Sequence, residues 1–443
     1  MRLIQTIKNI FKIEDLRSRL IYTFSIILLY RLGKYITLPG IDPSQLAGLK
    51  DQTSSGIMGL LDMFSGGAFS QASIFALGIM PYISASIVVQ LLGIIFPYFQ
   101  KLQKEGESGR RKMNQYTRYL TVAILVLQAP TYLVNLHNTL GPDAFVLSGF
   151  FFTFSSVIIL TAGTIFVMWL GEKITDKGIG NGISLIIMIG IVARLPANFV
   201  FEAGTRMSGA GGLIALIVEI VFLFVVVLGT ILLVQGTRRV PVQYARRIVG
   251  NKQYGGVRQY IPLKVNAAGV MPIIFAQAIM MLPIIIAGYA SDASSGFVVA
   301  FSDMYGFWYN LVTALLIIVF TYFYTAITIN PVQMAEDMKK NGGFIPGIKP
   351  GRKTVEFFDT IMSRITLPGS IFLALVAILP SVAVKVGVTG QFAQFYGETS
   401  LLILVGVILD TLQQIESHLL MRHYDGLMKS GRIKGRSGST RSI

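Results

Sequence analysis

Few residues in this chain have side chains that could carry out chemistry, and their spacing favours none of the common reactions. There is no cysteine, which excludes disulfides and thiolate chemistry. The histidines, His137, His418 and His423, are scattered without the spacing of metal ligands. No Ser/His/Asp arrangement and no pair of catalytic carboxylates is visible. We therefore expect no bound metal, no cofactor and no enzymatic activity.

The segment GIGNGIS, residues 178–184, comes nearest to a phosphate-binding loop. Such a loop ends in Lys-Ser or Lys-Thr and joins a strand to a helix. This segment has no lysine at that place and lies between two long apolar segments. We interpret its glycines as a tight re-entry into the second of those segments.

Three carboxylates lie within the long apolar segments, namely Glu219, Asp410 and Glu416. Ionisable groups inside a membrane are costly and often mark ion or proton paths. Glu416 falls near the expected cytoplasmic end of its segment, so we interpret it as interfacial. Glu219 and Asp410 are the candidates for ion coupling, which would make the chain a cation-coupled secondary transporter.

The apolar segments predict the fold class. Of the 443 residues 53% are hydrophobic and 14% are charged, whereas soluble domains carry about a quarter charged residues. Runs of roughly 18 to 25 apolar residues can cross about 30 Å of hydrocarbon as a helix. We predict an all-α integral membrane protein with ten spans, at about 20–38, 72–96, 119–136, 151–170, 183–203, 213–235, 267–289, 308–329, 366–384 and 399–420.

The basic residues, which give a net charge of +16, predict the orientation. They concentrate at both ends of the chain and in every second loop, whereas the alternate loops hold only Lys50, Arg206 and Lys385. Lysine and arginine accumulate on the cytoplasmic side, so we expect both termini in the cytoplasm. Ten spans divide into two inverted halves of five. The predicted parts are an N-terminal segment 1–19, halves 20–203 and 204–420, and a basic tail 421–443.

Two cytoplasmic loops are longer than this topology requires. Loop 236–265 combines basic residues with tyrosines and has no acidic residue. Loop 330–365 has the tip GGFIPGIKPG, whose glycines and prolines predict a protruding turn. Such loops could lie on anionic lipid or dock an acidic or polyanionic partner. Basic charge with aromatic residues at a protruding tip favours docking.

Isoleucine recurs near the middle of four predicted spans. In spans two and five a pair of isoleucines is spaced four residues apart, on one helix face. Any one of these residues is ordinarily lipid-facing or part of the core. Together they could form an apolar collar that closes a pore by excluding water, and the spacing does not choose between these interpretations. The residues are Ile79, Ile83, Ile183, Ile187, Ile273, Ile274 and Ile403.

Five long motifs identify the family that the chain resembles. They are MFSGGAFSQASIFALGIMPYISASI (63–87), KEGESGRRKMNQYTRY (104–119), MWLGEKITDKGIGNGISLII (168–187), PLKVNAAGVMPIIFA (262–276) and FIPGIKPG (344–351). Because of these motifs the chain resembles, over nearly its whole length, the SecY family, the central channel subunits of the bacterial protein translocase. The resemblance implies a channel that translocates unfolded secretory polypeptides and releases apolar segments laterally into the cytoplasmic, or inner, membrane.

The resemblance also implies roles for particular residues. A plug, at about 56–70, would lie beneath a pore ring. A lateral gate would open between spans two and three on one side and spans seven and eight on the other. The large loops would dock partners. The implied residues are Ile79, Ile83, Ile183, Ile187, Ile274 and Ile403 for the ring; Leu61, Met63, Phe64, Gly66 and Gly67 for the plug and its hinge; Gln90, Gln128 and Asn266 for the gate; and Arg238, Arg239, Arg246, Arg247, Lys349 and Arg352 for docking.

The implied partners are the SecE and SecG subunits, the motor ATPase SecA, the ribosome, signal sequences, nascent polypeptides and membrane lipids, with SecDF and YidC as further partners. Lys349 stands where the family usually has arginine, and lysine lacks the planar guanidinium fork that makes bidentate contacts. Gln235 stands where many relatives carry glutamate. The resemblance gives Glu219 and Asp410 no clear role, so we expect them to be structural. The alternatives are the transporter and a scaffold that only docks ribosomes.

Overall fold

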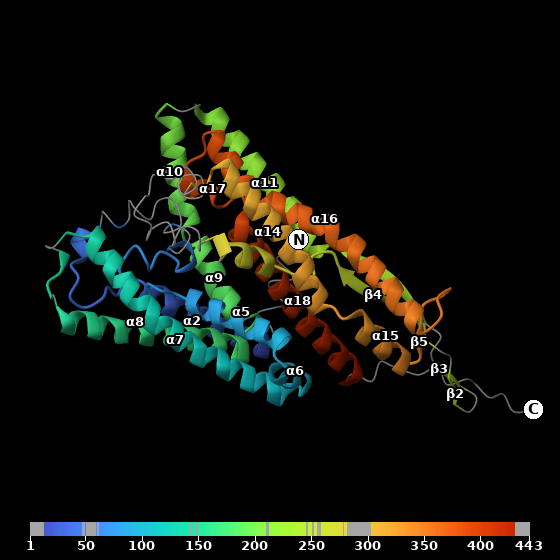
Figure 1. Ribbon diagram of the computed structural model, residues 1–443. Coiled ribbons are helices and arrows are strands. Elements are labelled where there is room, and N and C mark those ends of the chain that lie inside the picture. Colours follow the sequence, from blue (N-terminus) through green and yellow to red (C-terminus); the bar gives the residue numbers. More distant parts are fainter. Residues whose placement is uncertain are drawn as a thin grey trace, which may run out of the picture.

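The computed structural model describes residues 13–46, 49, 59, 62–141, 144–147, 149–209, 212–244, 247–249, 252–254, 258–277, 279–280 and 303–429, and most of this part is helical (Figure 1). The first half contains α2 (Glu14–Gly33), α5 (Met80–Ile95), α6 (Pro97–Lys104), α7 (Glu107–Thr139), α8 (Phe150–Lys177), α9 (Gly182–Val192) and α10 (Leu195–Met207). The second half contains α11 (Gly212–Gln235), α14 (Phe307–Thr328), α15 (Pro331–Lys340), α16 (Arg352–Lys385), α17 (Gly390–Ala393) and α18 (Glu398–Lys429).

The helices form two bundles that meet along α9 and α18 (Figure 1). In the first bundle α5 packs on α7, α7 on α8, and α2 on α8. In the second bundle α14 packs on α16, and α11 packs on α18. The contact of α9 with α18 joins the bundles, and α10 adds contacts to α11 and α17. The described helices therefore pack in two groups, and α9, α10 and α18 connect them.

The predicted fold class, an all-α membrane protein, is confirmed. Within the described residues seven helices are long and apolar enough to cross a membrane, and eight if the bent pair Met80–Gly93 and Pro97–Gln103 counts as one. The first predicted span, α2, is not among them because Arg17, Arg19 and Arg31 interrupt its apolar run. The seventh predicted span, 267–289, is described at 267–277 and 279–280, and of these 271–277 and 279–280 are helical.

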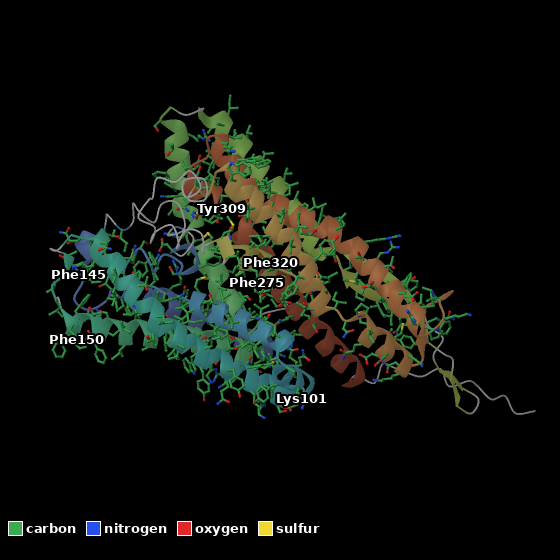
Figure 2. All side chains as sticks on the ribbon, in the orientation of Figure 1. Lys101, Phe145, Phe150, Phe275, Tyr309 and Phe320 are labelled. Carbon is green, nitrogen blue, oxygen red and sulfur yellow. The ribbon has the colours of Figure 1, made fainter. Side chains whose placement is uncertain are left out.

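Large apolar side chains cover the outward surface of the bundles, as lipid contact requires. Phe150 and Phe151 are among the most exposed, and Phe150 is seen at the edge of the first bundle in Figure 2. Inward, Phe275 stacks on Phe320 of α14, with ring centroids 5.6 Å apart (Figure 2). The seventh predicted span thus packs on the eighth through its described residues.

Two predicted spans differ from the observed helices. The second was expected to be helical from residue 72, but α5 begins only at Met80, and residues 65–79 form turns. Pro81 suits the first turn of a helix but cannot continue one from before. Instead Leu38 N donates to Ala72 O over 2.8 Å, so this stretch pairs with the chain after α2. The fifth span is divided into α9 and α10 at Ala193 and Arg194.

The two large loops, 236–265 and 330–365, fold together, which the sequence analysis missed. Strand β1 (Thr237–Tyr244) pairs antiparallel with β4 (Arg258–Lys264), and β5 (Gly343–Phe344) pairs with the other edge of β1. A hairpin of β2 (Arg247–Val249) and β3 (Lys252–Tyr254) lies between β1 and β4 in the chain. Val240, Val242 and Leu263 from these strands pack against Phe358 of α16. One sheet therefore connects the loop after span six to the loop after span eight.

The predicted glycine turn before span five is confirmed, and the structure gives its physical reason. Asn181 caps α9, because its side chain accepts a hydrogen bond from Ser184 N. Gly182 lies so close to α8 that a Cβ there would overlap the carbonyl oxygen of Gly171. The glycine therefore lets the chain reverse with the backbones of α8 and α9 almost in contact.

The substitution Gly182→Ala should lower the free energy of unfolding by about 1–3 kcal/mol, because the added methyl forces α8 and α9 apart. The measurement is unfolding of the purified chain in detergent. Gly204→Ala is the control, since a Cβ at Gly204 in α10 meets no atom within 4 Å and alanine favours a helix. Equal losses for both variants would contradict this account.

Candidate functional site

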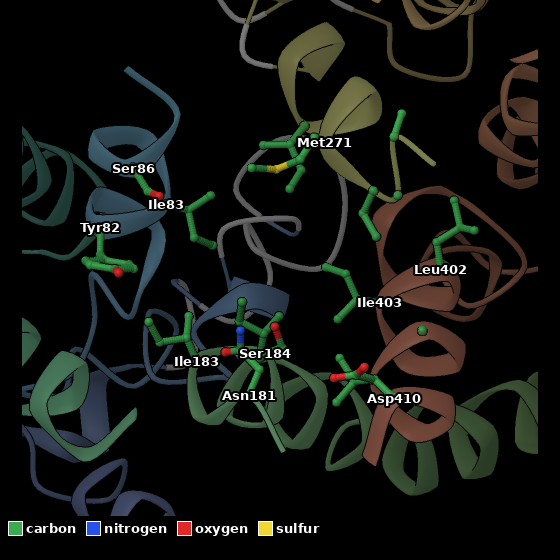
Figure 3. A pocket seen from close by; sticks show the side chains of 17 residues that line it. Tyr82, Ile83, Ser86, Asn181, Ile183, Ser184, Met271, Leu402, Ile403 and Asp410 are labelled. Carbon is green, nitrogen blue, oxygen red and sulfur yellow. The ribbon is translucent and has the colours of Figure 1, made fainter. Parts of the chain in front are cut away.

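Five of the six predicted ring isoleucines line one cavity of about 450 Å³ (Figure 3). They come from α5, from the beginning of α9, from the helical residues 271–277 and from α18. Both halves of the chain therefore contribute to its wall. The five residues are Ile83, Ile183, Ile187, Ile274 and Ile403.

The sixth isoleucine, Ile79, does not line this cavity. It precedes α5 and is only 2% exposed, because it packs in the main core cluster. The same cluster contains Met63 and Phe64, together with Ile187 and Ile403 of the cavity wall. Ile79 thus belongs to the apolar layer that joins the collar to the segment around Phe64.

Polar side chains occupy one part of the cavity wall. Tyr82, Ser86, Asn181, Ser184 and Asp410 lie there, from α5, α9 and α18 (Figure 3). The Asp410 carboxylate is exposed and accepts a hydrogen bond of 3.3 Å from the amide of Gln414. The Gln414 amide oxygen in turn accepts from Gly180 N over 2.9 Å. Asp410 is therefore connected through Gln414 to the turn before α9.

Glu219, the other candidate for ion coupling, lies apart from the cavity in a buried ion-pair cluster. Arg206 pairs with Glu219 and, over 3.1 Å, with Glu202. Glu202 also accepts hydrogen bonds from the backbone N and the hydroxyl of Thr389. The sequence analysis placed Arg206 in a loop, but it is a buried residue of α10. The cluster fastens α10 and α11 to the turn after α16, in agreement with the structural role expected for Glu219.

The segment 62–70 is folded against the first half of the chain. Met63 and Phe64 are buried in the main core cluster. Gly66 and Gly67 have φ of 68° and 85°, the left-handed region that favours glycine. Gly66 also faces Gly190 of α9 so closely that a Cβ there would lie 2.9 Å from Gly190 Cα. The predicted hinge glycines thus also permit close packing. Leu61, predicted as part of this segment, lies outside the described residues.

Polar contacts hold this segment in place. Tyr30 donates to Ser65 O and Arg31 to Gly66 O, both over 3.1 Å. Asp62 is fully buried, accepts a hydrogen bond from Ser70 N over 2.8 Å and pairs with Arg194. Sequence reasoning counted Arg194 for neither side of the membrane and did not consider Asp62. An aspartate inside an otherwise apolar segment was the available signal, because a buried carboxylate needs a partner.

The predicted gate residues have different surroundings. Gln90 of α5 accepts a hydrogen bond of 3.2 Å from the Tyr324 hydroxyl of α14, which links the two bundles. Gln128 is exposed on α7 and is not brought to this contact. Asn266 has a buried side-chain oxygen without a hydrogen-bond partner among the described residues. Tyr324, which sequence reasoning missed, is the residue that Gln90 contacts.

Four of the predicted docking residues are exposed, on the sheet formed by the two large loops and on the turn beside it. Arg238 and Arg239 lie on β1, and Lys349 and Arg352 lie where the chain turns into α16. The pairing of β1 with β5 brings these two loops together. Arg247 belongs to β2, and Arg246 lies outside the described residues.

Within the described ranges there is no group of three or more His, Asp or Glu side chains that could hold a metal ion. Within the described residues, both halves form the wall of an apolar cavity, the segment 62–70 packs in the same core cluster, and a polar contact crosses between the bundles.

Comparisons with known proteins agree with this architecture. The family model SecY matches residues 73–412. The protein translocase subunit SecY of Corynebacterium glutamicum is 44% identical over 438 residues, covering 95% of this chain and 98% of the relative. The subunit from Mycobacterium tuberculosis strain H37Rv is 42% identical over 434 residues, covering 94% and 97%.

Solved structures have the same fold. A protein-conducting channel superposes with a TM-score of 0.59 at 20% identity, covering 90% of this chain and 92% of the other. A SecY structure whose plug domain stabilises the closed state gives 0.61 at 19%, with the same coverage. Sec61 in the canine ribosome–channel complex gives 0.55 at 19%, again with that coverage.

The substitution Asp62→Asn should lower the free energy of unfolding by about 3 kcal/mol, the low end for a buried pair, because Arg194 remains 23% exposed. Replacing both partners, Asp62→Asn with Arg194→Gln, should recover part of that loss. Unfolding in detergent measures both variants.

Glu107→Gln is the control for this experiment, since its pair with Arg111 is exposed and should contribute little. The assignment of the Asp62–Arg194 pair as a buried anchor would be wrong if Glu107→Gln and Asp62→Asn had the same effect.

Proposed function

This chain belongs to the SecY family, and on that basis we propose that it is the channel subunit of a protein translocase. It conducts unfolded secretory polypeptides across the cytoplasmic membrane and releases apolar segments laterally into lipid. The observation that carries this proposal is the cavity ringed by isoleucines from both halves, with the segment 62–70 packed in the same apolar cluster. Energy would come from translation, a partner ATPase or the membrane potential.

The isoleucine collar would seal the resting channel. Branched apolar side chains exclude water and ions, and they bind no particular sequence tightly. Because the collar residues come from α5, α9, α18 and the helical residues 271–277, a separation of the halves would widen it. A translocating chain could therefore be surrounded by side chains that adapt to its shape.

The segment 62–70 would act as the plug. In the observed arrangement it is held by Tyr30, Arg31 and Arg194. Displacing it would break the buried Asp62–Arg194 pair and would uncover Met63 and Phe64. These costs favour a closed channel until a secretory chain compensates for them.

The seam between α5 and α14 would be the lateral gate. The hydrogen bond between Gln90 and Tyr324 crosses it. A signal sequence is an apolar helix, so it gains by reaching lipid through this seam once the hydrogen bond is broken.

The cytoplasmic sheet with its neighbouring turn would dock the ribosome and the motor ATPase SecA. Its exposed arginines and Lys349 suit polyanionic or acidic partners. A relative with the same fold, Sec61, forms a ribosome–channel complex. We further propose the SecE and SecG subunits as stable partners, contacts with SecDF and YidC, and an orientation with both termini in the cytoplasm.

The transporter alternative has no support in this site. Glu219 is paired with Arg206 away from the cavity, and Asp410 is exposed and hydrogen-bonded to Gln414. The curated relatives are protein translocase subunits. A scaffold without a pore would not need a collar shared by both halves.

The substitutions Ile83→Gly and Ile187→Ser should raise the ion conductance of the resting channel several-fold, because smaller or polar side chains let water enter the collar. Conductance is measured on the reconstituted full chain in planar bilayers. Ile158→Gly on the outward surface of α8, at a residue 53% exposed, is the control and should change nothing. Unchanged conductance in the collar variants would count against the channel.

The substitution Tyr324→Phe should make the channel accept weakened signal sequences about fivefold better, since the lost hydrogen bond contributes about 1 kcal/mol to the closed gate. The measurement is translocation of the substrate into membrane vesicles, where the translocated chain becomes protected from protease. Tyr322→Phe is the matched control on the same helix. The gate assignment would be contradicted if both variants exported a substrate with a weakened signal sequence equally well.

A further inference from the structure

One buried carboxylate oxygen, Oε2 of Glu219, is left unexplained by the contacts described above. Glu219 is only 7% exposed, and its Oε2 has no hydrogen-bond partner among the residues that the structure describes. Buried polar atoms are almost always hydrogen-bonded. An ionised carboxylate can only accept hydrogen bonds, so in that form Oε2 would be a buried acceptor without a donor. The ion pair with Arg206 therefore accounts for only half of this carboxyl group.

The charges around Glu219 do not balance. Arg206 of α10 pairs with Glu219 and also with Glu202, so one guanidinium faces two carboxylates. All three residues are buried. A buried charge without a partner of opposite charge is costly, and such a group commonly becomes neutral instead. Two carboxylates that share one arginine in this environment therefore favour the uptake of one proton.

The hydrogen bonds indicate which of the two carboxyl groups stays ionised. Both oxygens of Glu202 accept: Oε1 from Arg206 Nε over 3.1 Å, and Oε2 from the hydroxyl of Thr389 and, over 3.1 Å, from its backbone N. Glu219 accepts from Arg206 through Oε1 alone. Oε2 of Glu219 is thus the position where a proton displaces no hydrogen bond, and the neighbouring Glu202 carboxylate can accept from it.

One more titratable group faces the cluster, Tyr396 in the turn before α18. Its hydroxyl donates to Glu219 O over 3.0 Å. Burial raises the pKa of Tyr396, and negative charge on the nearby glutamates raises it further, so this hydroxyl keeps its proton. Helices α16 and α18 pack on α11 with apolar side chains, Leu379, Leu401 and Val405 among them. Arg206 is thus the cation that the described contacts supply to the two carboxyl groups.

We propose that the cluster of Glu202, Arg206 and Glu219 is a proton-binding site, with one proton held on Oε2 of Glu219 at neutral pH. The proton leaves one carboxylate for one guanidinium, so the buried cluster has no net charge. It also turns the unpartnered oxygen into a donor. Bound there it stabilises the folded chain and needs no path across the membrane, since Glu219 does not line the collar cavity.

The proton makes the junction of the two halves sensitive to pH. Glu202 and Arg206 belong to α10 of the first half, whereas Glu219 belongs to α11 and Thr389 to the turn after α16. A glutamate of the unfolded chain loses its proton at about pH 4.3, so at neutral pH the folded chain binds one proton more. Stability therefore falls as the pH rises, until the cluster has released its proton. That this loosens a clamp between the halves of a channel rests on the proposed function.

The test follows unfolding of the purified full chain in detergent between about pH 6 and about pH 9, above the range in which unfolded glutamates titrate. Glu219→Gln keeps the oxygen that Arg206 contacts and places an N–H donor where the proton would be. Relative to this variant, the unfolding equilibrium constant of the unchanged chain should rise up to about tenfold for each pH unit. Histidines titrate in both chains, so their effect cancels in the ratio.

Glu107→Gln is the control, because the pair of Glu107 with Arg111 is exposed and its removal should leave the pH dependence unchanged. The infrared C=O band of a protonated carboxyl group is a second readout at neutral pH, in a detergent without ester groups. The band should be present in the unchanged chain and in Glu107→Gln, and absent from Glu219→Gln.

The proposal is overturned if the unchanged chain lacks this band, a result that requires no variant to fold. It is also overturned if the band persists undiminished in Glu219→Gln, or if Glu219→Gln and Glu107→Gln have the same pH dependence. Neither readout uses conductance or translocation, so the outcome is separate from that of the proposed function.

Discussion

Backbone that is buried without being helical must find its hydrogen-bond partners within the protein, and the site depends on how this chain meets that requirement. Between Ser65 and Ile79 the chain follows turns rather than a helix. Its amides and carbonyls bond to the segment after α2 and to the side chains of Tyr30, Arg31 and Tyr132. These contacts create a non-helical layer in the midst of long helices, and the collar isoleucines pack on it.

That layer also explains where charge is tolerated. Asp62 is buried because Arg194 and the backbone of Ser70 satisfy it. Glu202 is buried because Arg206 and Thr389 satisfy it, and Glu219 is buried beside them because Arg206 pairs with one of its carboxylate oxygens. Both clusters involve α10 or the residue before it, at the place where the first half of the chain joins the second. The cluster around Arg206 links the two halves, in addition to the apolar core cluster to which both halves contribute.

The spans and the collar could be predicted from the sequence because both depend on local patterns of apolar residues. The late start of α5 at Met80 could not be predicted, because Ala72 pairs with Leu38, a residue 34 positions away. The sheet in the two large loops was missed because β1 finds its second partner, β5, only after two further predicted spans. The buried pair of Asp62 with Arg194 was missed because its partners, 132 residues apart, meet only in the folded chain.

Helix α16 runs without interruption through 34 residues, a length of about 51 Å at 1.5 Å per residue. One end follows the exposed turn with Lys349, and the other leads into the turn that holds Thr389 against Glu202. Such a helix couples its two ends mechanically. A displacement of the turn with Lys349 would be transmitted to the junction of the halves, with α14 moving alongside because it packs on α16.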